Sequence, residues 1–145
     1  FFGVTAMLHE VHSQKYFMGR LNYGDDLLGV LTQTCQDLKI SLGHVQAIGA
    51  VQKAVLGYYH QEQKSYHTIH LDQHLEIVQL TGNISLKDAV PFVHAHLTLS
   101  DASGRTFGGH HFPGTLIFAC EVFIHAVQGS PFERVLDATT GLPLW

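Results

Sequence analysis

The sequence predicts an α+β fold in which a mainly antiparallel β-sheet packs around one principal helix. Several segments rich in Val, Ile, Tyr and Thr have the length and alternation of strands. Only one segment has convincing helical periodicity, and the chain contains no internal repeat and no linker. A chain of 145 residues can bury a core of its own, so we expect a single domain over residues 1–145.

The helix is predicted within residues 23–40, YGDDLLGVLTQTCQDLKI. Asp25 is a candidate N-cap because its carboxylate can accept hydrogen bonds from the first free backbone amides. Gly43 follows as a helix breaker. Four residues recur at helical spacing and predict the buried face: Leu28, Leu31, Cys35 and Leu38.

The remaining segments alternate or are enriched in β-branched and aromatic residues, as is typical of strands. Gly49 suggests a bend or bulge in the second of them. Residues 101–111, DASGRTFGGHH, are predicted as a turn. The predicted strands are 15–21, 44–60, one or two strands within 66–85 ending at Gly82-Asn83, 92–100, and 114–129.

Composition limits the classes of function. Hydrophobic residues make up 46% and charged residues 14% of the chain, which is typical of a folded globular protein. The net charge is -4, and the 8 Lys and Arg residues form no run. Strong non-specific binding of nucleic acid depends on clustered cations, so the charge gives little support to a DNA-binding role.

The sequence also favours a reducing cellular compartment. Cys35 and Cys120 match no zinc or redox spacing, and we interpret them as buried thiols. The first residues, FFGVTAMLHEVH, lack the basic start of a secretory signal, and no apolar run approaches the ~18 residues of a membrane span. We therefore expect a cytoplasmic protein with no membrane segment.

The segment 93–111 concentrates the candidate chemistry. On a strand the side chains alternate, so Val93, Ala95, Leu97 and Leu99 would face the core while His94 and His96 share the polar face. Two imidazoles at i and i+2 are close enough to share a transition metal, zinc above all. The alternative is that both are exposed polar residues on a sheet in a chain that contains 12 histidines.

A third ligand would come from the segment that folds back after the turn. Gly108 and Gly109 permit backbone conformations that other residues avoid. If that segment is extended, His110 and His111 face opposite sides, so only one of them would join His94 and His96. The other spaced histidines, His67, His70 and His74, are interpreted as surface residues.

The ordered motifs resemble the PPC domain, the plant and prokaryote conserved domain. The strongest likeness lies in PFVHAHLTLSDASGRTFGGHHFPGTLIFACEVFI, and GRLNYGDDLLGVL, VQAIGAVQKAVLGYY and LEIVQLTGNIS extend it over a core of about residues 16–127, with flanks 1–15 and 128–145. The resemblance is to the free-standing type of bacteria and archaea. The sequence contains no Arg-Gly-Arg-Pro hook like that of the plant nuclear proteins, so the family's DNA-binding label gains little support from this chain.

This resemblance implies an antiparallel sheet around one helix, a homotrimer, and a metal ion held by His94, His96 and His110. His111 stands where the family usually has an apolar residue, and it would either add a ligand or pack at the rim of the site. Arg20 and Glu76 match recurring family positions. They would orient the site or a ligand, or else form an ordinary ion pair.

The last long strand supports assembly independently of the resemblance. One predicted face contains Leu116, Phe118, Cys120, Val122 and Ile124, and the other contains Ile117, Ala119, Phe123 and Val127. A strand that is apolar on both faces is covered on both faces, and a second subunit would supply part of the cover. The alternative is that residues 1–14 and 130–145 supply it.

Three functions remain open at this level. The first is a non-enzymatic PPC-type regulatory or DNA-associated protein with a histidine metal site. The second is a metal-dependent enzyme in which Glu76 or Glu121 acts as a general base. The third is a sensor of a small ligand or anion, with Arg20 and the histidines in a cleft between subunits.

Overall fold

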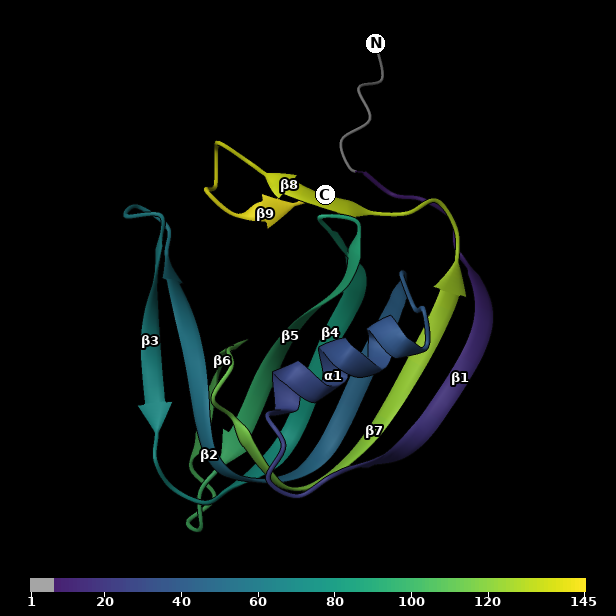
Figure 1. Cartoon of the computed structure of the whole chain (residues 1–145). Helices are drawn as coiled ribbons and strands as arrows, with labels where there is room; N and C mark the ends of the chain where they lie inside the picture. Colours follow the sequence, from purple (N-terminus) through teal and green to yellow (C-terminus); the bar gives the residue numbers. More distant parts are fainter. Residues whose placement is uncertain (1–6) are drawn as a thin grey trace.

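Long antiparallel strands form most of the computed structural model, which describes residues 7–145 (Figure 1). Within these residues one helix accompanies nine strands, so the expected mainly β fold with one helix is confirmed. The elements are β1 (His12–Leu21), α1 (Leu27–Asp37), β2 (Gly43–His60), β3 (Ser65–Leu71), β4 (Leu75–Lys87), β5 (Val90–Ser100), β6 (Thr106–His111), β7 (Leu116–Gln128), β8 (Glu133–Leu136) and β9 (Pro143–Leu144).

The long strand β2 organises the sheet. Its first half pairs with β7 and β4, and its second half pairs with β3 and β6, so the sheet curves and closes through this strand. The pairing with β4 shifts register between Ala47 and Gly49, which confirms the predicted bulge. Gly49 has φ +147, and a Cβ there would overlap the carbonyl oxygen of Ala119, so the close approach of β7 requires glycine.

The helix α1 lies across one face of the sheet, in front of β4, β2 and β7 (Figure 1). Leu27, Leu31 and Cys35 are its buried residues. The predicted face was therefore wrong at both ends, since Leu28 is only half-buried and Leu38 is 45% exposed. Leu38 follows the last helical residue as the C-cap, where the backbone no longer points the side chain at the sheet.

The N-cap of α1 is Asp26 and not Asp25. One carboxylate oxygen of Asp26 accepts a hydrogen bond from the amide of Gly29 at 2.8 Å, and the other accepts from the amide of Gly114 at 2.6 Å. The same side chain therefore caps the helix and joins it to the segment before β7. The sequence prediction chose Asp25 because spacing alone does not separate two neighbouring carboxylates.

Two strand boundaries also differ from the prediction. The segment 66–85 forms parts of two strands, β3 and β4, but β4 continues past Gly82-Asn83 to Lys87. A Cβ at Gly82 would overlap the carbonyl oxygen of His94, so this glycine permits close strand pairing and does not end the strand. The predicted turn 101–111 is shorter, because β6 begins at Thr106.

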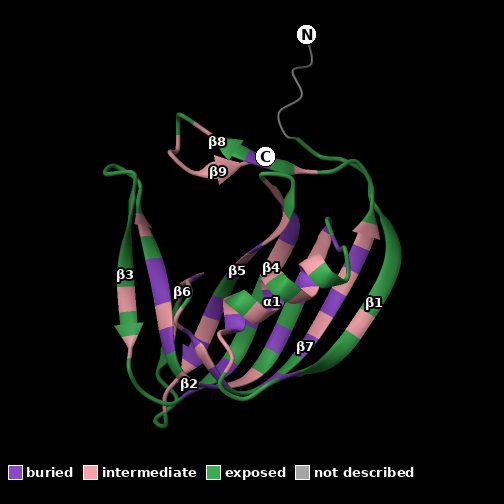
Figure 2. Ribbon diagram, in the orientation of Figure 1, coloured by how far each residue is buried: buried purple, intermediate pink, exposed green. Residues whose placement is uncertain are grey.

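The strand β7 buries Ile117, Cys120, Val122, Ile124 and Ala126, which are side chains from both predicted faces. Phe118 is 60% exposed, contrary to its predicted place on the core face. The cause is the irregular pairing of β7 with β2 around Val51, which changes the alternation of buried residues near Phe118. Figure 2 shows the buried stripes on the central strands, with β1 and β3 mostly exposed.

The C-terminal segment covers the end of β4 and not β7. Strand β8 pairs in parallel with β4, and β9 pairs with β8. Phe132 and Trp145 lie with ring centroids 4.7 Å apart. Both cysteines are free and buried, as predicted, and burial raises the pKa of each thiol to about 11. Within residues 7–145 no helix has both the length and the apolar character that a bilayer crossing needs.

The two neighbouring carboxylates provide a test of the cap. Asp26→Ala removes the acceptor of two backbone amides and should lower the free energy of unfolding by about 1–2 kcal/mol in urea titration. Asp25→Ala is the matched control and should change it by less than about 0.5 kcal/mol. Equal losses in the two variants would contradict the assignment of Asp26 as the N-cap.

Candidate metal centre

The alternation of β5 places His94 and His96 on the face of the sheet opposite the core. Val93, Ala95, Leu97 and Leu99 are all buried, as the sequence predicted. The register of β5 with β6 sets His96 directly opposite His110. Paired residues of antiparallel strands project from the same face, so the three imidazoles gather on one side of the hairpin.

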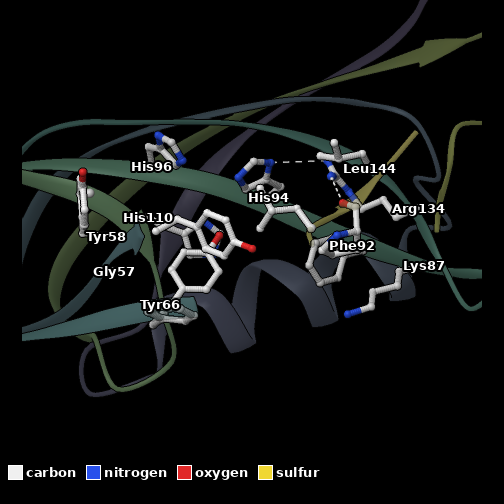
Figure 3. Close-up of a pocket in the computed structure, with 15 residues that line it drawn as sticks. Gly57, Tyr58, Tyr66, Lys87, Phe92, His94, His96, His110, Arg134 and Leu144 are labelled. Carbon is white, nitrogen blue, oxygen red and sulfur yellow. Dashed lines mark hydrogen bonds between the residues drawn. The ribbon is translucent and has the colours of Figure 1, made fainter. Parts of the chain in front are cut away.

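The three rings form a compact triangle. The ring centroids lie 5.3 Å apart for His94 and His96, 5.1 Å for His94 and His110, and 5.7 Å for His96 and His110. Each ring offers a nitrogen, and these three nitrogens lie within 4.8 Å of one another. Figure 3 shows the rings side by side at the margin of a pocket. The structure thus brings together the three residues that the sequence singled out.

Local electrostatics keeps two of these rings neutral. Burial lowers the pKa of His94 to about 4, and the positive charge of Arg134 and the neighbouring His96 act in the same direction. Burial also lowers the pKa of His110 to about 4, with further contributions from His94, His96 and Arg134. At neutral pH both imidazoles therefore present an unprotonated nitrogen, which is the form that binds a metal ion.

The donor set fits a divalent transition metal. Nδ1 of His110 is buried and has no hydrogen-bond partner among the described residues. Ligand atoms around a tetrahedral zinc ion lie roughly 3.4 Å apart, so the three rings would converge after small rotations. Three protein ligands leave one position open for water or a ligand. The ion would polarise whatever occupies that position.

Arg134 is the buried cation next to this triangle, and it comes from β8. It donates to the side chains of Asn83 at 2.7 Å and Ser85 at 3.0 Å, and to the carbonyl of Pro143 at 3.1 Å. Its Nη2 lies 3.5 Å from Nδ1 of His94, at the outer limit of a hydrogen bond. These contacts hold the guanidinium in place, so its charge acts on the histidines at a fixed distance.

A pocket of about 550 Å³ lies against the three histidines. Its other walls come from the β2–β3 hairpin, from Phe112 after β6, and from the C-terminal hairpin. The charged side chains in its lining are Lys87 and Arg134 (Figure 3). Sequence reasoning missed both residues. Arg134 lies 40 residues from His94 in the chain, and no motif connects the two positions.

His111 lies on the opposite side of β6 from His110 and is only 1% exposed. It pairs with Leu56 of β2, and neither ring nitrogen has a hydrogen-bond partner among the described residues. Neither sequence alternative was right, because this side chain is inside the core and not at the rim or at the metal site. Burial lowers its pKa to about 4; Asp26 opposes that shift and His110 adds to it.

The other candidate site residues lie elsewhere. Arg20 and Glu121 line a second pocket, of about 830 Å³, on the face of the sheet away from α1. Glu76 lines a third pocket beside Ser100 and Asp101. None of the three lines the pocket of the histidines. Their roles toward a ligand stay predictions, and they would act at separate surfaces of this chain.

The family model of the Plants and Prokaryotes Conserved (PCC) domain matches residues 8–128. The chain belongs to this family. It is the family that the sequence motifs resemble under the name PPC domain. The matched region contains all three histidines of the triangle, while Arg134 and the C-terminal hairpin lie beyond it.

Solved structures of PCC-domain relatives are closely similar. The metal-containing protein AF0104 of Archaeoglobus fulgidus has a TM-score of 0.92 and 43% identity, covering 97% of this chain and 99% of that one. A plant- and prokaryote-conserved (PPC) protein of Pyrococcus horikoshii has a TM-score of 0.88 and 32% identity, covering 98% and 96%. A protein of Ralstonia eutropha JMP134, described as a candidate DNA-binding protein, has a TM-score of 0.78 and 26% identity, covering 88% of each chain.

The domain also occurs within a much longer protein. The bifunctional protein GlmU of Synechococcus sp. strain JA-2-3B'a(2-13) is 34% identical over 131 residues. These cover 89% of this chain but only 20% of GlmU. The similarity therefore concerns the PCC domain and a small part of that relative.

The buried His111 predicts a loss of stability in acid. Its pKa is about 4 in the folded chain and about 6.5 when unfolded, so the unfolded chain takes up the proton first as the pH falls. The stability that the folded chain gains from keeping His111 neutral is complete above pH 6.5 and is lost as the pH falls toward 4. As the pH falls from 7 to 5, the free energy of unfolding of His111→Leu should therefore rise by about 2 kcal/mol relative to that of the wild type.

The measurement is urea unfolding at pH 7, 6 and 5 in the presence of a chelator. His70→Leu, at an exposed position of β3, is the matched control and should follow the wild type. A His111→Leu stability difference that does not change with pH would contradict the prediction.

Proposed function

We propose that this PCC-domain chain is a non-enzymatic regulatory protein that binds a divalent transition metal, zinc, through His94, His96 and His110. The triangle of three imidazole nitrogens within 4.8 Å carries the proposal. Nitrogen ligands suit zinc and its neighbours in the transition series, whereas magnesium and calcium prefer oxygen. The similarity to a relative described as metal-containing, at 43% identity, supports it further.

A binding role is favoured over catalysis by the lining of the pocket. No Asp or Glu from the described residues lines it, and Glu76 and Glu121 line other pockets. A general base must lie within hydrogen-bond reach of the proton that it removes. The enzyme hypothesis would therefore need a base other than these two glutamates.

Metal content tests the proposal directly. Purified wild-type protein should contain about one zinc ion per chain by elemental analysis, and His94→Ala, His96→Ala and His110→Ala should each lose at least about tenfold in zinc affinity. His67→Ala is the matched control, because His67 is exposed on β3 and lies outside the triangle. Wild-type metal content in all three alanine variants would overturn the proposal.

Association with DNA is a second candidate role, suggested by the relative from Ralstonia eutropha. The net charge of -4 gives it little support, because phosphate contacts require clustered cations. A gel shift with duplex DNA at physiological salt tests it. The absence of any complex at micromolar protein would remove this role and leave the metal proposal intact.

We also propose that the chain assembles as a homotrimer through the sheet face away from α1. Met18 of β1, Ile48 of β2 and Val78 of β4 are 83%, 55% and 51% exposed, and they line one pocket. A contiguous apolar surface on a sheet is commonly covered by a second chain. In a closed trimer a different surface of the next copy would cover this patch, and a trimer is what the family resemblance implies.

Light scattering coupled to size exclusion tests the assembly. The wild type should elute with the mass of a trimer, and Ile48→Glu should shift it toward the monomer, because it would bury an uncompensated charge. Leu136→Glu is the matched control, since Leu136 is exposed on β8 outside that pocket. A monomeric wild type at micromolar concentration would refute the trimer.

A further inference from the structure

The pocket beside the three histidines carries unbalanced positive charge. Within residues 7–145 its lining contains Lys87 and Arg134 but no Asp or Glu, and neither cation forms a salt bridge. A divalent ion on the histidines would add two positive charges to the same space. Concentrated charge of one sign in a recess attracts the opposite charge, so this lining favours an anion.

The two cations differ in what they can offer. Arg134 already donates to Asn83, Ser85 and Pro143, so it acts on a bound anion mainly through its charge. The ammonium of Lys87 lies 5.2 Å from the centre of the Phe92 ring, and the guanidinium of Arg134 lies 5.6 Å from the same ring. Figure 3 shows Lys87, Phe92 and Arg134 at the same end of the pocket, next to His94.

The opposite part of the pocket is aromatic. Tyr66 and Phe112 lie 4.9 Å and 4.8 Å from the ring of His110, and 5.0 Å from each other. A Cβ at Gly57 would overlap the ring of Phe112, so this glycine allows the ring to lie over β2. Leu142, Pro143 and Leu144 of the C-terminal hairpin add an apolar wall. These surfaces suit a flat apolar group.

The volume limits the size of the ligand. About 550 Å³ lies within the range of about 300–1,000 Å³ that is usual for small-molecule sites. The pocket is large enough for a molecule of one or two rings and is too small for a folded partner. An aromatic group and a negative charge together match its two ends.

We propose that this pocket binds a small aromatic carboxylate. The carboxylate lies at the end formed by His94, Lys87 and Arg134, and the ring packs against Tyr66 and Phe112. The inference rests on the proposed metal function in one respect, because an ion on the histidines would offer its open position as a further anchor for the carboxylate. It deepens that function by naming the class of ligand.

Four simple probes separate the two ends of the pocket in isothermal titration calorimetry. Benzoate has the ring and the charge, benzamide has the ring alone, acetate has a carboxylate without the ring, and inorganic phosphate has the charge in another geometry. Benzoate should bind zinc-loaded protein, and each of the other three should bind at least about tenfold more weakly. Equal affinity for benzamide, acetate or phosphate would overturn the assignment of an aromatic carboxylate.

Paired variants test the residues. Lys87→Met keeps the aliphatic stem and should weaken benzoate binding about tenfold. Lys53→Met removes the same charge from an exposed position of β2 outside this pocket, and it should bind benzoate as the wild type does. Gly57→Ala should displace the Phe112 ring and weaken the binding of benzoate more than the binding of acetate. Equal effects of the two lysine variants would contradict a direct role for Lys87.

The same titrations distinguish this inference from the metal proposal. Protein that contains zinc at one ion per chain but does not bind benzoate would refute the aromatic carboxylate site alone. Protein that binds benzoate but never retains zinc would refute the metal site alone. Weaker benzoate binding after chelation, with the Lys87→Met effect preserved, is the expected result if the metal ion is the second anchor.

Discussion

The alternation of side chains along β5 is the constraint on which the site depends. Val93, Ala95 and Leu97 are buried in the core. The two histidines that alternate with them must therefore face the other side of the sheet. A shift of one residue in the register would bring the histidines of β5 into the core and turn its leucines toward water. The hydrophobic core thus fixes the histidines on the pocket side before any ligand is present.

The register of the β5–β6 hairpin adds the third imidazole by the same rule. His96 and His110 are paired residues, and the next position along β6 is the core residue His111. Two neighbouring histidines in the sequence therefore have opposite environments. One lies at the pocket among two other imidazoles, and the other is buried beside Leu56 with unsatisfied nitrogens.

The lining of the pocket comes partly from residues that the family model matches and partly from the C-terminal hairpin beyond them. The matched residues 8–128 supply the histidines, Lys87 and the aromatic wall. The C-terminal hairpin supplies Arg134 and an apolar wall, and its guanidinium helps to keep two of the histidines neutral. Part of the pocket wall therefore comes from a segment outside the residues that the family model matches.

The sequence by itself determined the class of fold, most of the strands, the bulge at Gly49 and the three histidines, because these depend on periodicity and on short motifs within one hairpin. The sequence prediction placed the N-cap of α1 one residue early and assigned part of its buried face wrongly, because neighbouring carboxylates and leucines satisfy the same pattern. Only the tertiary structure brought Arg134 of β8 to His94 of β5 and separated Glu121 from both. Contacts between strands distant in the chain follow from pairing and closure of the sheet, which leave no periodic trace in the sequence.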